Sequence, residues 1–315
     1  MRIVILDART LGDDLNLSMM DGLGQVDVYP MTQPEDLQER MKDADVVVVN
    51  KIKLNRDNLP CAKKLKLICV TATGYDNIDV NYCWQNEIGV SNVRGYSSFS
   101  VAQLTISMAL SLATHLTEYN RYVKEGAYTK SGLQNYLKPT FHEIAGMTWG
   151  IVGLGNIGRQ VAAAAQAMGA HVLAYKRTED PDYECVPLNE LCRRSDIISL
   201  HLPLNEETKH LIHQRRIEMM KPGVIFINVA RGEVTDEQAL TDAVQSGHLG
   251  GLGIDVFSEE PLKGQHCYQQ IKDRDNVILT PHMAWGAYEA RVRCMEEVAE
   301  NIRAFFRGEK RNRVD

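Results

Sequence analysis

The chain has 315 residues and a formal net charge of −6, with 35 Lys and Arg against 41 Asp and Glu. This acidic balance argues against a nucleic-acid binder, and the length together with 44% apolar residues predicts a globular protein of two domains. Seven scattered cysteines without close pairs predict reduced thiols and no metal site. The N-terminus begins on a strand pattern without a cleavable apolar segment, so a cytoplasmic location is expected.

Short runs of Val, Ile and Leu recur along the chain between segments of helical composition. Because the runs are continuous rather than alternating in apolar character, they predict parallel strands that helices cover on both faces. Strands are expected over 3–6, 26–29, 46–49, 65–70 and 90–93, and then over 149–152, 172–175, 197–200, 224–229, 252–257 and 277–280. The predicted fold class is α/β, with two doubly wound, Rossmann-like parallel sheets.

A segment of different character joins the two sets of strands. Residues 95–117 carry no charged side chain, but their Ser, Thr and Gln residues predict a helix buried in protein rather than a membrane span. The polar stretch 118–143 is expected to form a long connection or arm outside the core, where a subunit contact could lie. A last helix is expected over 289–307.

The sharpest local motif is a glycine loop, in which Gly153, Gly155 and Gly158 surround Asn156 and Ile157. The loop follows a predicted strand and precedes an alanine-rich helical run, which is the context of a dinucleotide-binding loop. The glycines allow a tight turn and a close approach of the backbone to a pyrophosphate, while amides at the helix start bind the anion. The sequence therefore predicts a bound dinucleotide.

The end of the next predicted strand bears on the type of dinucleotide. An acidic residue is usual there because it binds the ribose hydroxyls, but this chain has Lys176, Arg177 and Thr178. Two cations and a hydroxyl can neutralise a 2′-phosphate, so the sequence favours NADP(H) over NAD(H). In the alternative, Lys176 and Arg177 form a solvated loop edge and Glu179 or Asp180 reaches the ribose.

Three ionisable side chains follow strand ends in the second set. Arg231, Glu260 and His282 come after its fourth, fifth and sixth predicted strands. Since ligands of open α/β sheets bind outside the carboxyl ends of the strands, the three are expected at one site.

The chemistry of these side chains suits hydride transfer to a 2-keto acid. Arg231 can clamp a carboxylate with its fork of donors and polarise the adjoining carbonyl. His282 can pass a proton to the developing alkoxide, and Glu260 can orient the imidazole and favour its protonated form. Each residue alone has an ordinary structural interpretation, but together, behind a dinucleotide loop, they predict a catalytic set.

Three further residues are candidates for the cofactor site. Asp255 lies in an apolar strand and therefore needs a partner, either the nicotinamide amide or the backbone. His201 and Pro203 follow another strand end and either line the cofactor or make ordinary packing contacts.

These motifs together resemble the D-isomer-specific 2-hydroxyacid dehydrogenase family over nearly the whole chain. The matching stretches are 150–158, 201–204, 228–232, 254–257 with 260–261, and 280–285. The resemblance implies that Arg231, Glu260 and His282 are catalytic, that Asp255 helps to seat the nicotinamide, and that Ala230 is a cofactor contact. It also implies a homodimer, and a cleft between a substrate-binding domain (1–98 and 286–315) and an inserted dinucleotide-binding domain (99–285).

A narrower resemblance concerns the substrate. Lys51 with its preceding Asn, the stretch 72–79, and Trp285 resemble the glycerate dehydrogenase, hydroxypyruvate and glyoxylate reductase branch. This implies a substrate contact at Lys51, a substrate carboxylate held by the amides around Thr73 and Gly74, and a small pocket capped by Trp285. The expected function is NAD(P)H-dependent reduction of hydroxypyruvate or glyoxylate, without a nucleic-acid or membrane partner. Alternatives are a phosphoglycerate or D-lactate dehydrogenase, or a dinucleotide-sensing binding protein like the related corepressors.

Overall fold

The computed structural model describes all 315 residues, which fold into two compact units. One unit comprises residues 1–97 and 286–315, and the other comprises residues 98–285. Each unit is built around one parallel sheet, of five and seven strands respectively. The predicted α/β fold class with two Rossmann-like parallel sheets is therefore confirmed.

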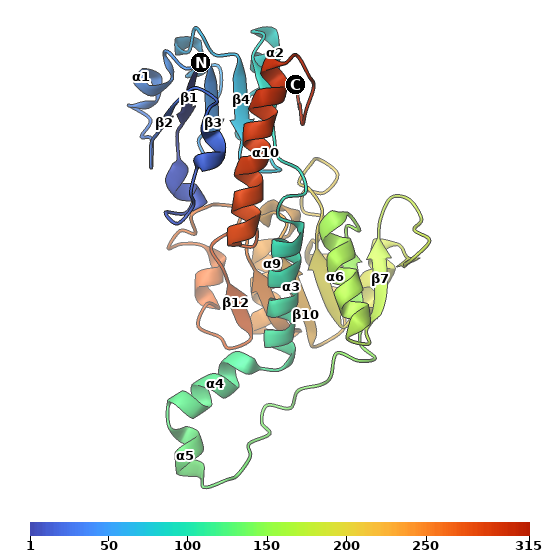
Figure 1. Cartoon of the computed structure of the whole chain (residues 1–315). Helices are drawn as coiled ribbons and strands as arrows, with labels where there is room; N and C mark the ends of the chain where they lie inside the picture. Colours follow the sequence, from blue (N-terminus) through green and yellow to red (C-terminus); the bar gives the residue numbers. More distant parts are fainter. The chain divides into compact units, whose positions relative to one another are not determined.

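The five-stranded sheet has the order β2-β1-β3-β4-β5, with every neighbouring pair parallel. Its strands are β1 (Arg2–Ile5), β2 (Gln25–Val28), β3 (Val46–Val49), β4 (Leu67–Val70) and β5 (Gly89–Ser91). Its helices are α1 (Leu37–Met41), α2 (Val80–Gln85) and α10 (Tyr288–Phe306), with short 3-10 turns at Ala8–Leu11, Ser18–Met20 and Leu59–Cys61. Helix α10, red in Figure 1, brings the C-terminal part of the chain back against β4.

The seven-stranded sheet has the order β12-β11-β10-β9-β6-β7-β8 and is also parallel throughout. Its strands are β6 (Thr148–Val152), β7 (His171–Tyr175), β8 (Glu184–Cys185), β9 (Ile197–Leu200), β10 (Val224–Asn228), β11 (Leu249–Ile254) and β12 (Val277–Leu279). The chain order reverses beside β6, because β7 lies on one side of it and β9 on the other. Doubly wound sheets bind their ligands at such a switch point.

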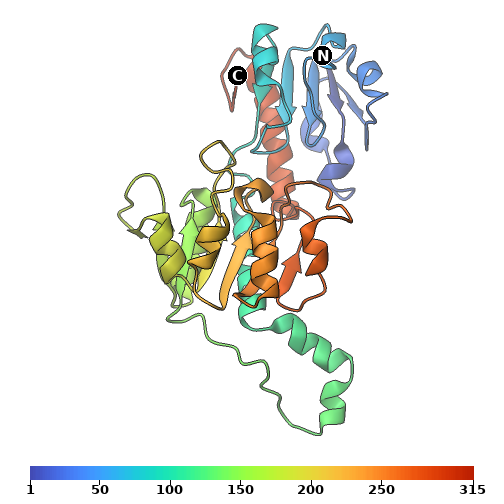
Figure 2. The same ribbon diagram turned by 180° about the vertical axis from the view of Figure 1, so that it is seen from behind.

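Helices cover both faces of this sheet. Helices α3 (Ser98–Ala113) and α6 (Asn156–Ala167) form one apolar core with it, and α7 (Leu188–Arg194), α8 (Gln214–Glu218) and α9 (Glu237–Gln245) form the other. Figure 1 shows the first face and Figure 2 the second. Two 3-10 turns, Gly232–Val234 and Cys267–Gln270, complete the unit.

The uncharged segment forms α3, and glycines let it lie close to the sheet. A Cβ on Gly251 would lie 3.1 Å from Cβ of Leu112, and one on Gly253 would lie 3.2 Å from Sδ of Met108. The same glycines concealed the strand in the sequence, so β11 begins three residues earlier than the expected 252–257. The two-residue strand β8 was not predicted.

The stretch 118–143 forms an arm that begins with two helices, α4 (Leu116–Lys124) and α5 (Ala127–Ser131), where a connection was expected. No residue of α4 or α5 is buried, as predicted for a segment outside the core. No single helix has the length and apolar composition to cross a membrane; α3 and α4 pass that test only as a pair, which is bent by 63°.

Candidate functional site

The three strands that precede Arg231, Glu260 and His282 are neighbours in the sheet. They are β10, β11 and β12, whose carboxyl ends lie at one edge because all neighbouring pairs are parallel. The loops that follow these strands therefore start side by side.

His282 and Glu260 are in direct contact. Nδ1 of His282 lies 2.7 Å from Oε2 of Glu260, and the other carboxylate oxygen accepts the N–H of Phe257 at 3.2 Å. The two side chains are 22% and 32% exposed, so a small molecule can reach them. His282 also has a φ of +52°, a left-handed conformation that is unfavourable for a residue with a Cβ. The chain after His282 must therefore be held in place.

Asp255 holds it. Its side chain is fully buried, and its carboxylate accepts the hydroxyl of Thr280 at 2.6 Å and the N–H groups of Met283 and Ala284, both at 2.9 Å. Burial raises the pKa of Asp255, and these donors oppose that rise. Of the two partners left open by the sequence, the structure shows the backbone. Residues on both sides of His282 are thus fixed to one carboxylate.

Arg231 presents a guanidinium that forms no ion pair with a carboxylate of the chain. Its Nη1 donates to the carbonyl of Ala230 at 2.8 Å. The main chain is fixed by Asn228, whose side chain accepts the N–H of Ala230 at 3.0 Å and donates to the carbonyl of Arg231 at 2.9 Å. A positioned guanidinium with unused donors is suited to bind an anion.

The glycine loop joins β6 to α6 as predicted. Gly153 has a φ of +98° and donates its N–H to the carbonyl of Tyr175 at 3.0 Å. Gly155 precedes the helix, which begins at Asn156 and Ile157. A Cβ on Gly158 would lie 2.2 Å from the carbonyl oxygen of Gly153, whereas one on Gly155 would meet nothing within 4 Å. Gly158 therefore serves the packing of the loop itself, and Gly155 leaves open space at the start of α6, as a pyrophosphate site requires.

At the end of β7, Lys176 is not a free cation, as the prediction of a 2′-phosphate site assumed, but pairs with a carboxylate of its own chain. Lys176 Nζ lies 2.9 Å from Oδ2 of Asp180, and Arg159 of α6 forms a second ion pair with the same oxygen. The Asp180 side chain is 0% exposed, and its hydrogen bond with Lys176 lowers its pKa. Arg177 is 88% exposed, and Thr178 is exposed too. The charge of Lys176 is thus partly neutralised by Asp180. The sequence did not lead us to predict Arg159 as part of this cluster, and its position just after the glycine loop was its only signal.

His201 turns its ring into the interior. Its Nε2 lies 2.9 Å from Oγ of Ser199, which also accepts Nε1–H of Trp149 at 3.0 Å. Burial lowers the pKa of His201 to about 3, so the ring is neutral. A Cβ on Gly153 would lie 2.7 Å from the backbone oxygen of His201, so it is the backbone of this residue that borders the glycine loop. Pro203 is exposed.

The candidate substrate residues of the other unit follow the neighbouring strands β3 and β4. Asp7 is buried and accepts the N–H of Lys51 at 2.7 Å, and burial raises its pKa. Thr73 donates its hydroxyl to the carbonyl of Val93 at 2.8 Å, while the N–H groups of Thr73 and Gly74 donate no hydrogen bond within the chain. These two amides can therefore bind an anion. Asp7 was missed, although an acid directly after an apolar strand is its signal.

Trp285 lies next to the catalytic candidates in sequence and in space. Its Nε1–H donates to the carbonyl of His282 at 2.9 Å. This contact fixes the indole beside His282 and leaves its ring half-buried.

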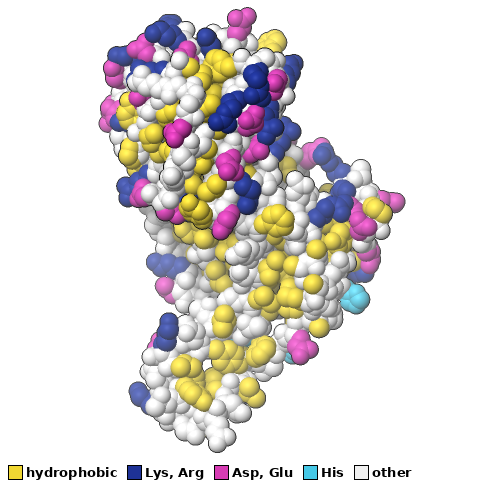
Figure 3. Space-filling model, viewed as in Figure 1, with side chains coloured by type: hydrophobic (Ala, Val, Ile, Leu, Met, Phe, Trp, Pro, Cys, Tyr) yellow, Lys and Arg dark blue, Asp and Glu magenta, His cyan; other side chains and the backbone are white.

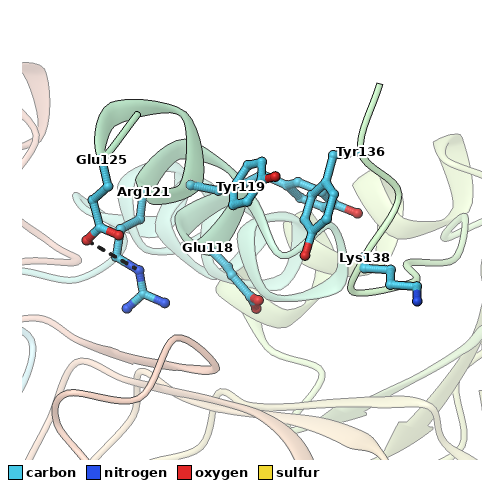
Figure 4. A pocket seen from close by; sticks show the side chains of 7 residues that line it. Glu118, Tyr119, Arg121, Glu125, Tyr136 and Lys138 are labelled. Atoms are coloured by element: carbon cyan, nitrogen blue, oxygen red, sulfur yellow. Dashed lines mark ion pairs between the residues drawn. The ribbon is translucent and has the colours of Figure 1, made fainter. Parts of the chain in front are cut away.

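A pocket of a different kind lies in the arm. It is lined by Glu118, Tyr119, Arg121, Tyr122, Glu125, Tyr136 and Lys138 (Figure 4). The rings of Tyr122 and Tyr136 are stacked 4.1 Å apart, so the arm folds back on itself. Arg121 pairs with Asp275, which precedes β12, so the arm meets the sheet at the opposite end of that strand from His282.

Two glycine substitutions separate loop packing from dinucleotide binding. We expect Gly158→Ala to destabilise the unit by about 1–3 kcal/mol, because its methyl group meets the Gly153 carbonyl. Gly155→Ala should leave thermal stability unchanged but weaken coenzyme binding at least about tenfold, because the methyl group takes the pyrophosphate's space. Thermal unfolding and coenzyme titration measure both effects. Gly264→Ala, in open space within an exposed segment, is the control, and equal coenzyme affinity in Gly155→Ala and wild type would contradict the assignment.

Comparison with known proteins identifies the family of the chain. A family model described as D-isomer specific 2-hydroxyacid dehydrogenase, NAD binding domain, matches residues 106–284. The chain is 36% identical over 324 residues to a hydroxypyruvate reductase of Blautia hydrogenotrophica, with 100% of both chains covered. It is 34% identical over 315 residues to a glycerate dehydrogenase of Methylorubrum extorquens, covering 100% of this chain and 99% of the relative.

A solved structure shows the same fold. The D-lactate dehydrogenase of Aquifex aeolicus, complexed with NAD and lactic acid, matches with a TM-score of 0.84 and 32% identity, covering 100% of this chain and 99% of that one. The family match spans more than half of the chain, and the relatives match along its whole length. The chain therefore belongs to the D-isomer-specific 2-hydroxyacid dehydrogenase family and is an NAD(P)-dependent oxidoreductase of 2-hydroxy acids.

Proposed function

We propose that this enzyme reduces hydroxypyruvate, and also glyoxylate, with Arg231, Glu260 and His282 as its catalytic residues. The observation that carries the catalytic proposal is the 2.7 Å contact between His282 and Glu260. These residues lie in the loops after β12 and β11, and β11 is the neighbour of β10, which Arg231 follows. The likeness to a hydroxypyruvate reductase and a glycerate dehydrogenase supports the choice of substrate.

Each residue has a defined task in this proposal. Arg231 binds the substrate carboxylate with two donors and polarises the adjacent carbonyl. Because Nδ1 of His282 faces Glu260, Nε2 is the ring nitrogen that hands a proton to the carbonyl oxygen as C2 accepts a hydride. Glu260 orients the ring and favours its protonated form. The bound nicotinamide supplies the hydride.

The remaining contacts are assigned by unit. We propose that residues 1–98 and 286–315 bind the substrate, through Lys51 and the free amides of Thr73 and Gly74. Residues 99–285 bind the dinucleotide, through the glycine loop, the backbone of His201 with Pro203 and Ala230, and the Asp255 loop. Trp285 caps a small side-chain pocket.

Removing the imidazole tests the central assignment. We expect His282→Ala to lower kcat by about 10²–10⁴, because the proton donor is lost, while coenzyme affinity stays within about twofold. Steady-state kinetics with hydroxypyruvate and a coenzyme titration measure the two quantities. His171→Ala, an exposed histidine at the start of β7, is the control. Near-normal turnover in His282→Ala would remove His282 from its role.

The coenzyme is the second part of the proposal. The three residues after β7, Lys176, Arg177 and Thr178, support NADP(H) over NAD(H), and the ion pair between Lys176 and Asp180 opposes it. A matrix of kcat/KM values for NADH and NADPH against hydroxypyruvate, glyoxylate and pyruvate decides coenzyme and substrate together. Pyruvate as the best substrate would favour a D-lactate dehydrogenase instead.

Asp180→Asn extends this matrix. Without the carboxylate, Lys176 and Arg159 are free for a 2′-phosphate, so we expect the NADPH to NADH ratio of kcat/KM to rise about tenfold. Asp182→Asn is the matched control, because that carboxylate is 70% exposed and 3.7 Å from Arg159. A strong NADH preference in both wild type and Asp180→Asn would refute the NADP(H) proposal.

We further propose that the enzyme is a cytoplasmic homodimer. The seven cysteines are all free, as in a reducing compartment. The arm exposes large apolar side chains, namely Leu116, Val123, Leu133, Leu137 and Phe141 (yellow on the lower part of Figure 3). A segment outside the core that exposes several large apolar side chains is typical of a surface that a second copy covers.

Sedimentation velocity tests the dimer. We expect a species of twice the 35.4 kDa chain mass, and dissociation to monomers in Val123→Asp/Leu137→Asp, since both side chains are more than half exposed. Trp84→Asp, an exposed substitution in the other unit, should leave the dimer intact. A monomeric wild-type enzyme would refute the dimer.

A further inference from the structure

The segment that carries Glu260 is exposed and has no regular secondary structure. Residues 258–265 leave the end of β11 and are exposed except for the half-buried Leu262. A catalytic carboxylate on such a segment needs anchors, because a displacement of about 1 Å can reduce an enzyme's rate a hundredfold.

Both ends are tied to Glu237, the first residue of α9. One carboxylate oxygen of Glu237 accepts the N–H of Ser258 at 2.9 Å, and the other accepts the Ser258 hydroxyl. The second oxygen also lies 3.0 Å from Nε2 of His266. Glu237 and His266 are only 9% and 8% exposed, so these bonds are shielded from water.

The hydrogen bonds of His266 show which nitrogen carries its proton. Its Nδ1 accepts the N–H of Tyr268 at 3.2 Å, so in the neutral ring Nε2 carries the hydrogen and donates to Glu237. Ser258 and His266 thus both donate hydrogen bonds to residue 237, which must accept them at the same time. A carboxylate accepts all three donors with its two oxygens, whereas a glutamine turns an NH2 group toward at least one of them and leaves that donor without an acceptor.

Glu237 lies only six residues after Arg231, so a short stretch of chain, 231–237, carries both. Gly232 lies so close to the start of the segment that a Cβ on it would be 2.1 Å from both the carbonyl carbon of Phe257 and the nitrogen of Ser258. From Arg231 through the 3-10 turn to Glu237, the chain thus touches Ser258 twice. The position of the Glu260 segment is set relative to the Arg231 loop by these contacts.

We propose that Glu237 is a positioning residue that, with His266, holds Glu260 in line with His282. The inference rests on the proposed catalytic roles of Glu260 and His282. We assign Glu237 no contact with substrate or coenzyme; it acts through the segment 258–266.

Hydrogen–deuterium exchange tests the anchoring without any assay of activity. We expect faster exchange in peptides covering 258–268 in Glu237→Ala, an intermediate rate in Glu237→Gln, and unchanged exchange elsewhere in the sheet. Glu233→Gln is the matched control, because that glutamate lies four positions earlier, is 40% exposed and pairs only distantly with Lys209, at 3.5 Å. Unchanged exchange over 258–268 in Glu237→Ala would overturn the proposal.

Kinetics test the effect on the catalytic pair. We expect kcat for keto-acid reduction to fall about tenfold to a hundredfold in Glu237→Ala and less in Glu237→Gln, with coenzyme affinity unchanged. The pH above which reduction declines should move lower in Glu237→Ala, in the same direction as in Glu260→Gln, because the protonated imidazole loses its carboxylate. A purely structural role would lower the amount of active enzyme and leave that pH unchanged.

A double variant distinguishes a failure of the positioning role of Glu237 from a failure of the proposed catalytic role of Glu260. If Glu237 acts through Glu260, Glu237→Ala/Glu260→Gln should be no slower than Glu260→Gln alone. Multiplying losses, with the pH profile of Glu237→Ala unchanged, would overturn the positioning role. Full activity in Glu260→Gln itself would instead refute the proposed function, and the exchange experiment would still report whether Glu237 anchors the segment.

Discussion

The carboxyl ends of parallel strands all meet at one edge of a sheet, and this constraint decides which side chains of the chain can act together. Strands β10, β11 and β12 are neighbours, so the loops after them begin side by side although a helix or a long segment separates them in sequence. Because β6 is parallel to these strands, the glycine loop that follows it begins at the same edge. Dinucleotide site and ionisable side chains therefore share one edge of one unit.

The two units use the same device to hold their functional loops. Asp7 follows β1 and accepts backbone N–H groups from the loop after the neighbouring β3, and Asp255 follows β11 and accepts them from the loop after the neighbouring β12. Both carboxylates are buried, which raises their pKa values, and the backbone donors favour the charged form. A buried acceptor with several fixed donors orders a loop at little cost in apolar surface.

Two other carboxylates, those of Asp180 and Glu237, bind charged side chains or an exposed segment of the chain. Asp180 draws Lys176 and Arg159 together at the end of β7, and Glu237 ties down the segment that carries Glu260. In both cases a carboxylate that is shielded from water holds two partners at once. Asp180 and Glu237 thus fix the positions of other side chains through hydrogen bonds and ion pairs.

Local patterns in the sequence were sufficient for much of this description. Continuous apolar runs predicted ten of the strands closely because buried parallel strands need them, and the glycine loop was clear because strand, turn and helix are adjacent in the chain. Arg231, Glu260 and His282 were predicted as site residues because each lies shortly after the end of such a run. The start of β11 was missed because its glycines, needed for the approach of α3, conceal the apolar pattern.

Tertiary structure alone decided the long-range hydrogen bonds and ion pairs of the buried carboxylates. The bonds of Asp7 with Lys51, of Asp180 with Arg159, and of Glu237 with His266 join residues that are far apart in sequence. A single sequence contains no local signal for such pairs, because they depend on which strand and helix ends become neighbours. The sequence by itself determined the class of chemistry, because motifs next to strand ends are local. The packing of the sheet decided which hydrogen bonds and ion pairs hold the side chains of the candidate site, because these join distant parts of the chain.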